Sequence, residues 1–324
     1  MQNSEKRFDY FSLSNYVFFA LLFFFFSFTT DTFFTLSNIY STLQNGAPII
    51  LLTCAITFAL LVGIFDLSVA AIGYATGCFC GILIKRYGVS IPISFLAGLL
   101  LAIFIGCINS ILIVKLKMNM MLTTLGMMLV IRSIGKIITE DRTILMGDQI
   151  TAIRQAKIGF LGGFPSVLVV VLLVLIISQI ILKYTRLGKY LIAVGCNERA
   201  AKIVGIKVEK IKIISLVTCA LISGIAGIVW VITLGSVVTR GLNSYEFIAI
   251  ASAVLGGTSL FGGRGSFLPG SFIGSIILLF IANGLTIMGA SPFIIPFFRG
   301  AIIFIAMYAD SLRTRSHRRM ANVS

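Results

Sequence analysis

The chain has 324 residues, of which 58% are hydrophobic and 11% are charged, and its formal net charge is +15. Soluble domains contain roughly 45–50% apolar residues, so no soluble core of this size could bury so much Leu, Ile, Val and Phe. The composition therefore excludes a soluble globular protein and indicates a membrane protein.

The net positive charge has two interpretations. A basic chain can bind nucleic acid, but a polytopic membrane protein acquires the same excess from Lys and Arg in its cytoplasmic loops. We favour the second interpretation and expect a membrane-lipid environment and no nucleic-acid partner. The one histidine is His317 in a basic tail, and the six cysteines lack metal-ligand spacing. We therefore expect no metal and no cofactor in this chain.

Apolar runs near 20 residues recur along the sequence, and each could cross ~30 Å of hydrocarbon as a helix. A helix satisfies its own backbone hydrogen bonds in lipid, so the predicted fold class is all-α, with one polytopic membrane domain over residues 1–324. We expect about ten transmembrane helices. Their predicted residues are 15–30, 46–64, 67–84, 91–114, 119–138, 164–182, 211–233, 247–261, 266–288 and 292–309.

The positions of Lys and Arg predict the orientation. If the N-terminus is cytoplasmic, most cations fall in cytoplasmic segments, including the dense cluster between Lys183 and Lys212, while Lys85 and Arg86 are a local exception. Cytoplasmic loops are enriched in Lys and Arg, so we expect both termini inside, residues 184–210 in the cytoplasm and residues 140–163 outside.

The basic passage contains "NERAAKIVG", which has the signals of a short helix. Asn197 is a suitable N-cap, Glu198 complements the positive end of the helix, and Gly205 is a natural stop. Ala200 and Ala201 make one side thin, which suits insertion into a groove on a partner. We interpret the segment as a docking element for a soluble cytoplasmic protein. The alternative is a basic connector between helices.

The second half contains the glycine-rich stretch "GGTSLFGGRGSFLPGSFIG". It lacks the GK[ST] ending of a phosphate-binding loop. Small residues allow close helix packing and a tight turn, which is the interpretation we favour. A broken or re-entrant helix that lines a cavity is the alternative.

Asp66 lies between two apolar runs, and an ionisable residue near membrane depth is a functional candidate. It could equally cap the helix that begins "LSVAAIG", and Ser68 is considered with it as a hydroxyl for bonds between helices. These two interpretations stay open. Together with Asn283, both residues are candidates for the translocation path or for a helix junction.

Two further polar residues lie near or within apolar runs. Asn283 should face the bundle interior, where a hydrogen bond to a neighbouring helix is favoured over contact with a transported solute. Glu246, near the outer end of a predicted helix, could contact an external protein or pair with Arg240; pairing is the simpler interpretation.

Five segments resemble one known family. "TRLGKYLIAVGCNERAAKIVGIKVEKIKI" is similar to the cytoplasmic loop of ribose-type ABC importer permeases, and "SYEFIAIASAVLGGTSLFGGRGSFLPGSFIG", "IANGLTIMGASPF", "GIFDLSVAA" and "TTLGMMLVIRSIG" resemble their other motifs. The motifs occur in the family's order, from about residue 33 to Asp310. Departures are Ile64 and Ala70, where the family has glycine, and Ile248, where it has an acidic residue.

The resemblance implies an inner-membrane sugar permease subunit that pairs with a second copy or a paralogue. It also implies docking of a cytoplasmic ATPase, which carries ATP and Mg, through the short loop helix, and delivery of a sugar by an external binding protein. No Walker A motif is present, so we expect no enzyme activity in this chain. The alternatives are an ion-gradient-driven secondary transporter and a polytopic membrane enzyme. The first would need acidic or histidine relays within its helices, and the second a catalytic constellation.

Overall fold

The computed structural model describes residues 20–21, 23–158, 164–291, 294–298, 300–301 and 304. The elements are α2 (Leu36–Leu61), α3 (Val69–Lys85), α4 (Ile91–Ser110), η1 (Ile111–Lys115), α5 (Met120–Ile138), β1 (Ile144–Leu145), α6 (Asp148–Gln155), β2 (Lys157–Ile158), β3 (Phe164–Pro165), α7 (Ser166–Tyr184), α8 (Arg186–Cys196), α9 (Glu198–Ile203), α10 (Val208–Leu234), β4 (Ser236–Val237), α11 (Tyr245–Leu255), η3 (Phe267–Ser271) and α12 (Phe272–Ile287).

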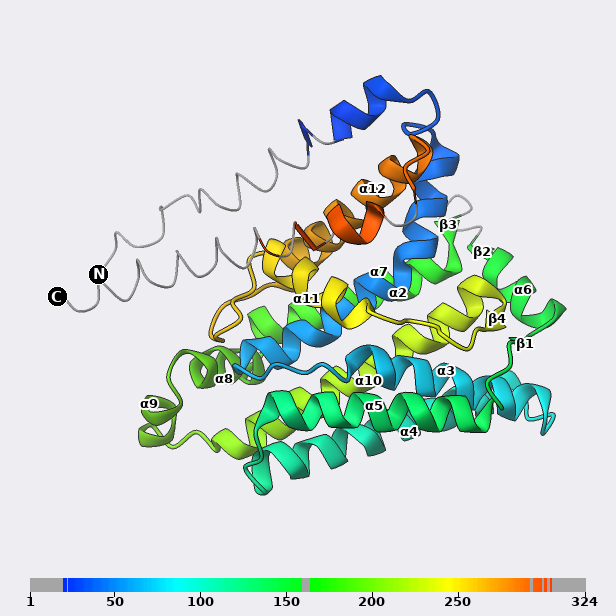
Figure 1. Ribbon diagram of the computed structural model, residues 1–324. Helices are drawn as coiled ribbons and strands as arrows, with labels where there is room; N and C mark the ends of the chain where they lie inside the picture. Colours follow the sequence, from blue (N-terminus) through cyan, green and yellow to red (C-terminus); the bar gives the residue numbers. More distant parts are fainter. Residues whose placement is uncertain are drawn as a thin grey trace.

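Helices α2 and α10 form the centre of the bundle. Helix α10 packs against α2, α3 and α4, and α2 also contacts α7, α11 and α12. Every residue of α2 from Gly46 to Leu61 is buried. Helix α5 lies along α3 on one side, and α11 and α12 lie on the other (Figure 1). The two central helices are therefore surrounded by protein, whereas the outer helices expose apolar side chains.

Six helices in the described residues are long and apolar enough to cross a membrane. They are Leu36–Leu61, Ile91–Lys115, Met120–Ile138, Ser166–Tyr184, Val208–Leu234 and Phe267–Ile287. The chain is an all-α polytopic bundle, but the prediction of about ten transmembrane helices is wrong.

Two of the predicted transmembrane helices are too short to cross a membrane. The run at 67–84 forms α3, with 17 residues, and the run at 247–261 forms α11, with 11 residues. A helix needs about 20 residues to cross the hydrocarbon core. Helix α11 ends at Leu255 because Gly256 and Gly257 follow, and Gly257 has a φ of +88°. Of the helix expected at 15–30, residues 20–21 and 23–29 are described and are helical, whereas the helix expected at 292–309 and both termini fall largely outside the described residues.

Short elements mark two opposite ends of the bundle (Figure 1). At one end, β1 pairs antiparallel with β4, with Ile144 opposite Val237, and α6 follows β1. At the other end, α8 and α9 project from the ends of α7 and α10. The segment expected outside the cell and the basic segment expected inside thus lie on different ends of the molecule.

The glycine-rich stretch forms a turn and also an irregular helix start, so it has features of both interpretations given for it above. It leaves α11 as a loop and re-enters the bundle as the π-helical turn η3, in which Leu268 is non-helical at φ −121° and ψ 125°. The Oε1 atom of Gln179 on α7 accepts hydrogen bonds from the backbone N–H groups of Phe267, at 3.0 Å, and of Leu268, at 3.1 Å. A protein side chain therefore satisfies this irregular backbone, as burial requires.

Candidate functional site

Helix α9 has the local geometry that its sequence predicts. The Oδ1 atom of Asn197 accepts a hydrogen bond from the backbone N–H of Ala200 at 3.0 Å, so Asn197 is the N-cap. Gly205 ends the segment with a φ of +84°, a conformation that favours glycine. Its N–H donates to the carbonyl of Lys202 at 3.0 Å. Both capping predictions are confirmed.

The exposed face of α9 differs from the expected one. Ala200 is exposed, but Ala201 is only 3% exposed and packs against the rest of the chain. The large apolar side chains that project outward are Ile203, 86% exposed, and Val204, 74% exposed and the C-cap of the helix. The cause is that the side of the helix that carries Ala201 lies against its own bundle. Any partner would meet the branched apolar pair instead.

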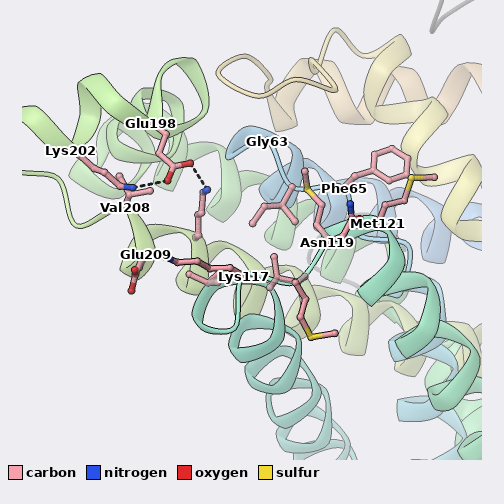
Figure 2. A pocket seen from close by; sticks show the side chains of 15 residues that line it. Gly63, Phe65, Lys117, Asn119, Met121, Glu198, Lys202, Val208 and Glu209 are labelled. Atoms are coloured by element: carbon pink, nitrogen blue, oxygen red, sulfur yellow. Dashed lines mark hydrogen bonds and ion pairs between the residues drawn. The ribbon is translucent and has the colours of Figure 1, made fainter.

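Glu198 ties α9 to the central helix. Its Oε2 atom accepts from the Lys212 Nζ on α10 at 2.7 Å, and its Oε1 atom lies 3.1 Å from the Lys202 Nζ (Figure 2). The hydrogen bond from Lys212 is the largest of several effects that hold the pKa of Glu198 below its usual value, and burial opposes it. Glu198 is therefore ionised at neutral pH, and the pair links the loop helix to α10.

A cavity of about 600 Å³ opens beside this ion pair. Figure 2 shows Glu198 and Lys202 on one side and Phe65, Asn119 and Met121 on the other. The Asn119 Oδ1 atom accepts from the backbone N–H groups of Met121 and Leu122, at 3.0 and 3.2 Å, and so caps α5. The loop between α2 and α3, the start of α5 and the basic segment thus meet around one space at the α9 end.

Four glycines connect the basic segment to the core, and we call them the glycine junction (Gly63, Gly195, Gly262 and Gly263). A Cβ atom added at Gly195 would overlap the carbonyl oxygen of Leu61 and the backbone nitrogen of Gly263. The N–H of Gly263 donates to the Leu61 carbonyl at 3.0 Å. The end of α8 therefore lies in backbone contact with the end of α2 and with the glycine-rich loop, and a side chain would prevent this approach.

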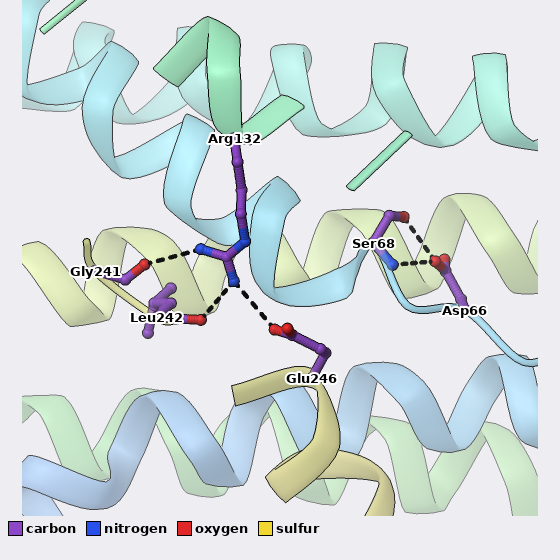
Figure 3. A network of polar contacts seen from close by, with 6 residues as sticks. All are labelled: Asp66, Ser68, Arg132, Gly241, Leu242 and Glu246. Carbon is purple, nitrogen blue, oxygen red and sulfur yellow. Dashed lines mark hydrogen bonds and ion pairs between the residues drawn. The ribbon is translucent and has the colours of Figure 1, made fainter. Parts of the chain in front are cut away.

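Near the opposite end, Arg132 and Glu246 form a buried ion pair. The Nη2 atom of Arg132 lies 3.1 Å from Oε2 of Glu246 and donates to the carbonyl of Leu242 at 2.8 Å, and Nη1 donates to that of Gly241 at 3.3 Å (Figure 3). The side chains are 14% and 4% exposed. Glu246 thus pairs with Arg132 and not with Arg240, and its carboxylate is not available to an external protein.

Asp66 shapes the turn that precedes α3. Its Oδ1 atom accepts from the backbone N–H of Ser68 at 2.8 Å and from its hydroxyl at 2.6 Å (Figure 3). Asn109 on α4 donates from Nδ2 to the Ser68 hydroxyl at 2.9 Å. Asp66 and Ser68 are both buried, so this network joins a helix start to a neighbouring helix.

Asn283 forms a reciprocal amide pair with Asn38, with Nδ2-to-Oδ1 distances of 3.0 and 3.1 Å. This contact between α12 and α2 confirms the expected hydrogen bond to a neighbouring helix. Sequence reasoning missed Asn38 and Gln179, although each is a polar amide in a segment that proved to be helical.

Among the described residues, no group of three His, Cys, Asp or Glu side chains could hold a metal ion.

Comparison with known proteins places the chain in a family of membrane transport components. The chain matches the family model described as "Branched-chain amino acid transport system / permease component" over residues 38–307, and it belongs to this family. With six helices in its described part able to span a bilayer, it is an integral protein of the inner membrane.

Several relatives of the chain are sugar permeases. The chain is 32% identical to the ribose import permease protein RbsC of Escherichia coli (strain K12) over 284 residues, which cover 87% of this chain and 88% of the relative. Identity is 33% to the ribose import permease of Bacillus subtilis (strain 168), covering 84% of both chains. It is 32% to the L-arabinose transport system permease protein AraH of Escherichia coli (strain K12), covering 83% of this chain and 80% of the relative.

The ribose-type resemblance of the motifs is therefore confirmed over most of the chain. A fructose import permease of Bifidobacterium longum (strain NCC 2705) is 28% identical and covers 81% of this chain and 74% of the relative. No solved structure matches.

Proposed function

We propose that the chain is the transmembrane permease subunit of a binding-protein-dependent ABC importer. It carries a monosaccharide, such as a ribose-like pentose, a hexose or a related small polyol, into the cytoplasm. A separate ATPase subunit binds ATP and Mg and docks on the basic segment at residues 184–210. An external sugar-binding protein delivers the solute, and a second permease copy or a paralogue completes the pore.

One structural observation carries this proposal. A short helix with two exposed apolar residues, Ile203 and Val204, projects from the basic end of the bundle and is joined by the Glu198–Lys212 pair to its central helix. Two adjacent exposed branched side chains on a loop that is expected in water form an apolar patch that a partner protein could cover. The similarity to ribose, arabinose and fructose permeases supports the sugar class.

Reconstitution in proteoliposomes tests the proposal. With the ATPase inside the vesicles, we expect uptake of a radiolabelled sugar only when ATP and the external binding protein are both present. The chain alone should hydrolyse no ATP. Uptake driven by a proton or sodium gradient without ATP would contradict the proposal and favour a secondary transporter.

The same vesicles test the docking face. Ile203→Asp places a charge where the apolar contact is proposed, so we expect normal membrane insertion, at least tenfold weaker copurification of the ATPase and a matching loss of uptake. Leu145→Asp is the matched control, because Leu145 is 73% exposed at the opposite end of the bundle. Full ATPase binding by Ile203→Asp would show that the segment is only a connector.

A further inference from the structure

A second, shallower groove lies next to the docking segment, around the start of α10. Its volume is about 540 Å³. Lys115, Lys202, Lys207, Lys210 and Glu209 line it, and Ile213 and Ile214 form its apolar part. Lys202, Val208 and Glu209 also border the larger cavity seen in Figure 2. The groove therefore combines several cations with an apolar surface on one helix.

The charges of the groove are only partly neutralised. Lys115 Nζ lies 3.2 Å from Glu209 Oε2, and Lys202 shares Glu198 with Lys212. Lys207 and Lys210 form no ion pair with any described residue, and both are exposed. Lys207 is also the N-cap residue of α10, where its ammonium group cannot accept a capping hydrogen bond. An anion in the groove would meet two unpaired ammonium groups beside the positive end of a long helix.

The position of the groove relative to the membrane points to one kind of anion. The candidate span Ile91–Lys115 ends at Lys115, and the candidate span Val208–Leu234 begins at Val208, so two spans have their ends here. The apolar wall, Ile213 and Ile214, follows one turn further along α10. Leu116 and Met118, which follow Lys115 in the chain, are also exposed apolar side chains, at 63% and 48%. A membrane crossed by these two spans would therefore have the cations at its headgroup level and the apolar side chains where acyl chains begin.

We infer that this groove binds the phosphate headgroup of an anionic phospholipid from the leaflet on the α9 side. Lys207 and Lys210 contact the phosphate, and Ile213 and Ile214 contact the first part of an acyl chain. A soluble phosphate would gain nothing from the apolar wall, and a zwitterionic lipid would lack the net negative charge that the unpaired lysines match. Basic pockets beside membrane helices recognise anionic lipid in this way.

The test measures lipid retained by the purified full chain. Protein in detergent is mixed with phosphatidylglycerol and phosphatidylcholine, and bound lipids are counted by native mass spectrometry. We expect preferential retention of phosphatidylglycerol. Lys207→Gln with Lys210→Gln should weaken its binding about 30-fold, because each lysine near an anionic lipid surface contributes about a factor of five. Lys207→Arg with Lys210→Arg should preserve binding.

The matched control is Lys183→Gln with Lys189→Gln, which removes the same charge from exposed positions outside the groove. It should leave phosphatidylglycerol binding within about twofold, because only the groove is specific. Equal losses in both double variants would overturn the inference, and so would unchanged binding in the groove variant. Displacement of the lipid by millimolar inorganic phosphate would indicate a soluble-anion site instead. Displacement by saturating ATPase would assign the groove to the docking interface.

Discussion

Arg132 shows how a charged residue can be held inside this apolar bundle. Its guanidinium is planar and can donate in several directions, and it contacts two carbonyl groups and one carboxylate. Tyr74 adds a further contact, with its ring centroid 6.0 Å from Arg132 Cζ, and its hydroxyl donates to the Thr239 carbonyl at 2.7 Å. Arg132 therefore holds the turn before α11 against α5, and Tyr74 holds it against α3.

Removal of one member of this pair should strongly destabilise the protein. Arg132→Met leaves the Glu246 carboxylate buried without its cation, and such changes cost roughly 3–5 kcal/mol. We expect a clear fall in the melting temperature of the purified protein in detergent. Arg132→Met with Glu246→Leu should recover part of the loss, because no buried charge remains.

The control for this prediction is Arg86→Met. Arg86 pairs with Glu140, but the side chains are 60% and 55% exposed, so the loss should lie within about 1 kcal/mol. Equal effects of Arg132→Met and Arg86→Met would contradict the role assigned to the buried pair.

Single polar residues were predicted from the sequence more reliably than their partners. Asn283 stands out inside an apolar run, and an amide there must bond to another helix. Its partner Asn38 is 245 positions away, and Glu246 lies 114 positions from Arg132. Pairs at such separations form only when particular helices pack together, and a single sequence does not show which helices do so. The outward face of α9 was mistaken for the same reason: helix periodicity does not say which side meets the bundle.

At the scale of elements, hydropathy located the long helices and local signals located α9. The predicted segment 119–138 became Met120–Ile138, and 164–182 became Ser166–Tyr184. Errors arose at the ends of helices. The expected helix 46–64 begins at Leu36, because Thr35 caps it and Pro48 is accommodated within it. Hydropathy averages over helix ends, so the short helices α3 and α11 were counted as spans and the number of spans was overestimated.

The glycine junction gives a prediction at this scale. Gly195→Ala would place a Cβ atom against the backbone of Leu61 and Gly263, so α8 must move away from α2. Overpacking of this kind costs typically 1–3 kcal/mol. We expect a lower melting temperature and weaker copurification of the ATPase.

Gly126→Ala is the control for this prediction. Nothing lies within 4 Å of a Cβ atom added there, and Gly126 is in the middle of α5. Alanine is the better helix former by about 1 kcal/mol, so this variant should be neutral or slightly stabilising. A harmless Gly195→Ala would mean that α8 does not need its close approach to the core.

At the scale of the whole molecule, the two polar ends predict a sidedness that labelling can measure. In a variant whose native cysteines have been replaced, Asp148→Cys on α6 should react with an impermeant thiol reagent added to intact cells. Lys202→Cys on α9 should react only after the membrane is opened, because the basic segment is expected inside. Labelling of Lys202→Cys in intact cells would reverse the proposed orientation.

Helix α10 connects these two ends as a single rigid rod. It starts beside the Glu198–Lys212 pair, ends at Gly235 before β4, and at 27 residues is about 40 Å long. A tilt of about 5° imposed at the α9 end would move the far end by about 3.5 Å, as with any lever of this length. Because α10 packs against α2, α3 and α4, a small push at the basic segment would be transmitted across the whole thickness of the membrane.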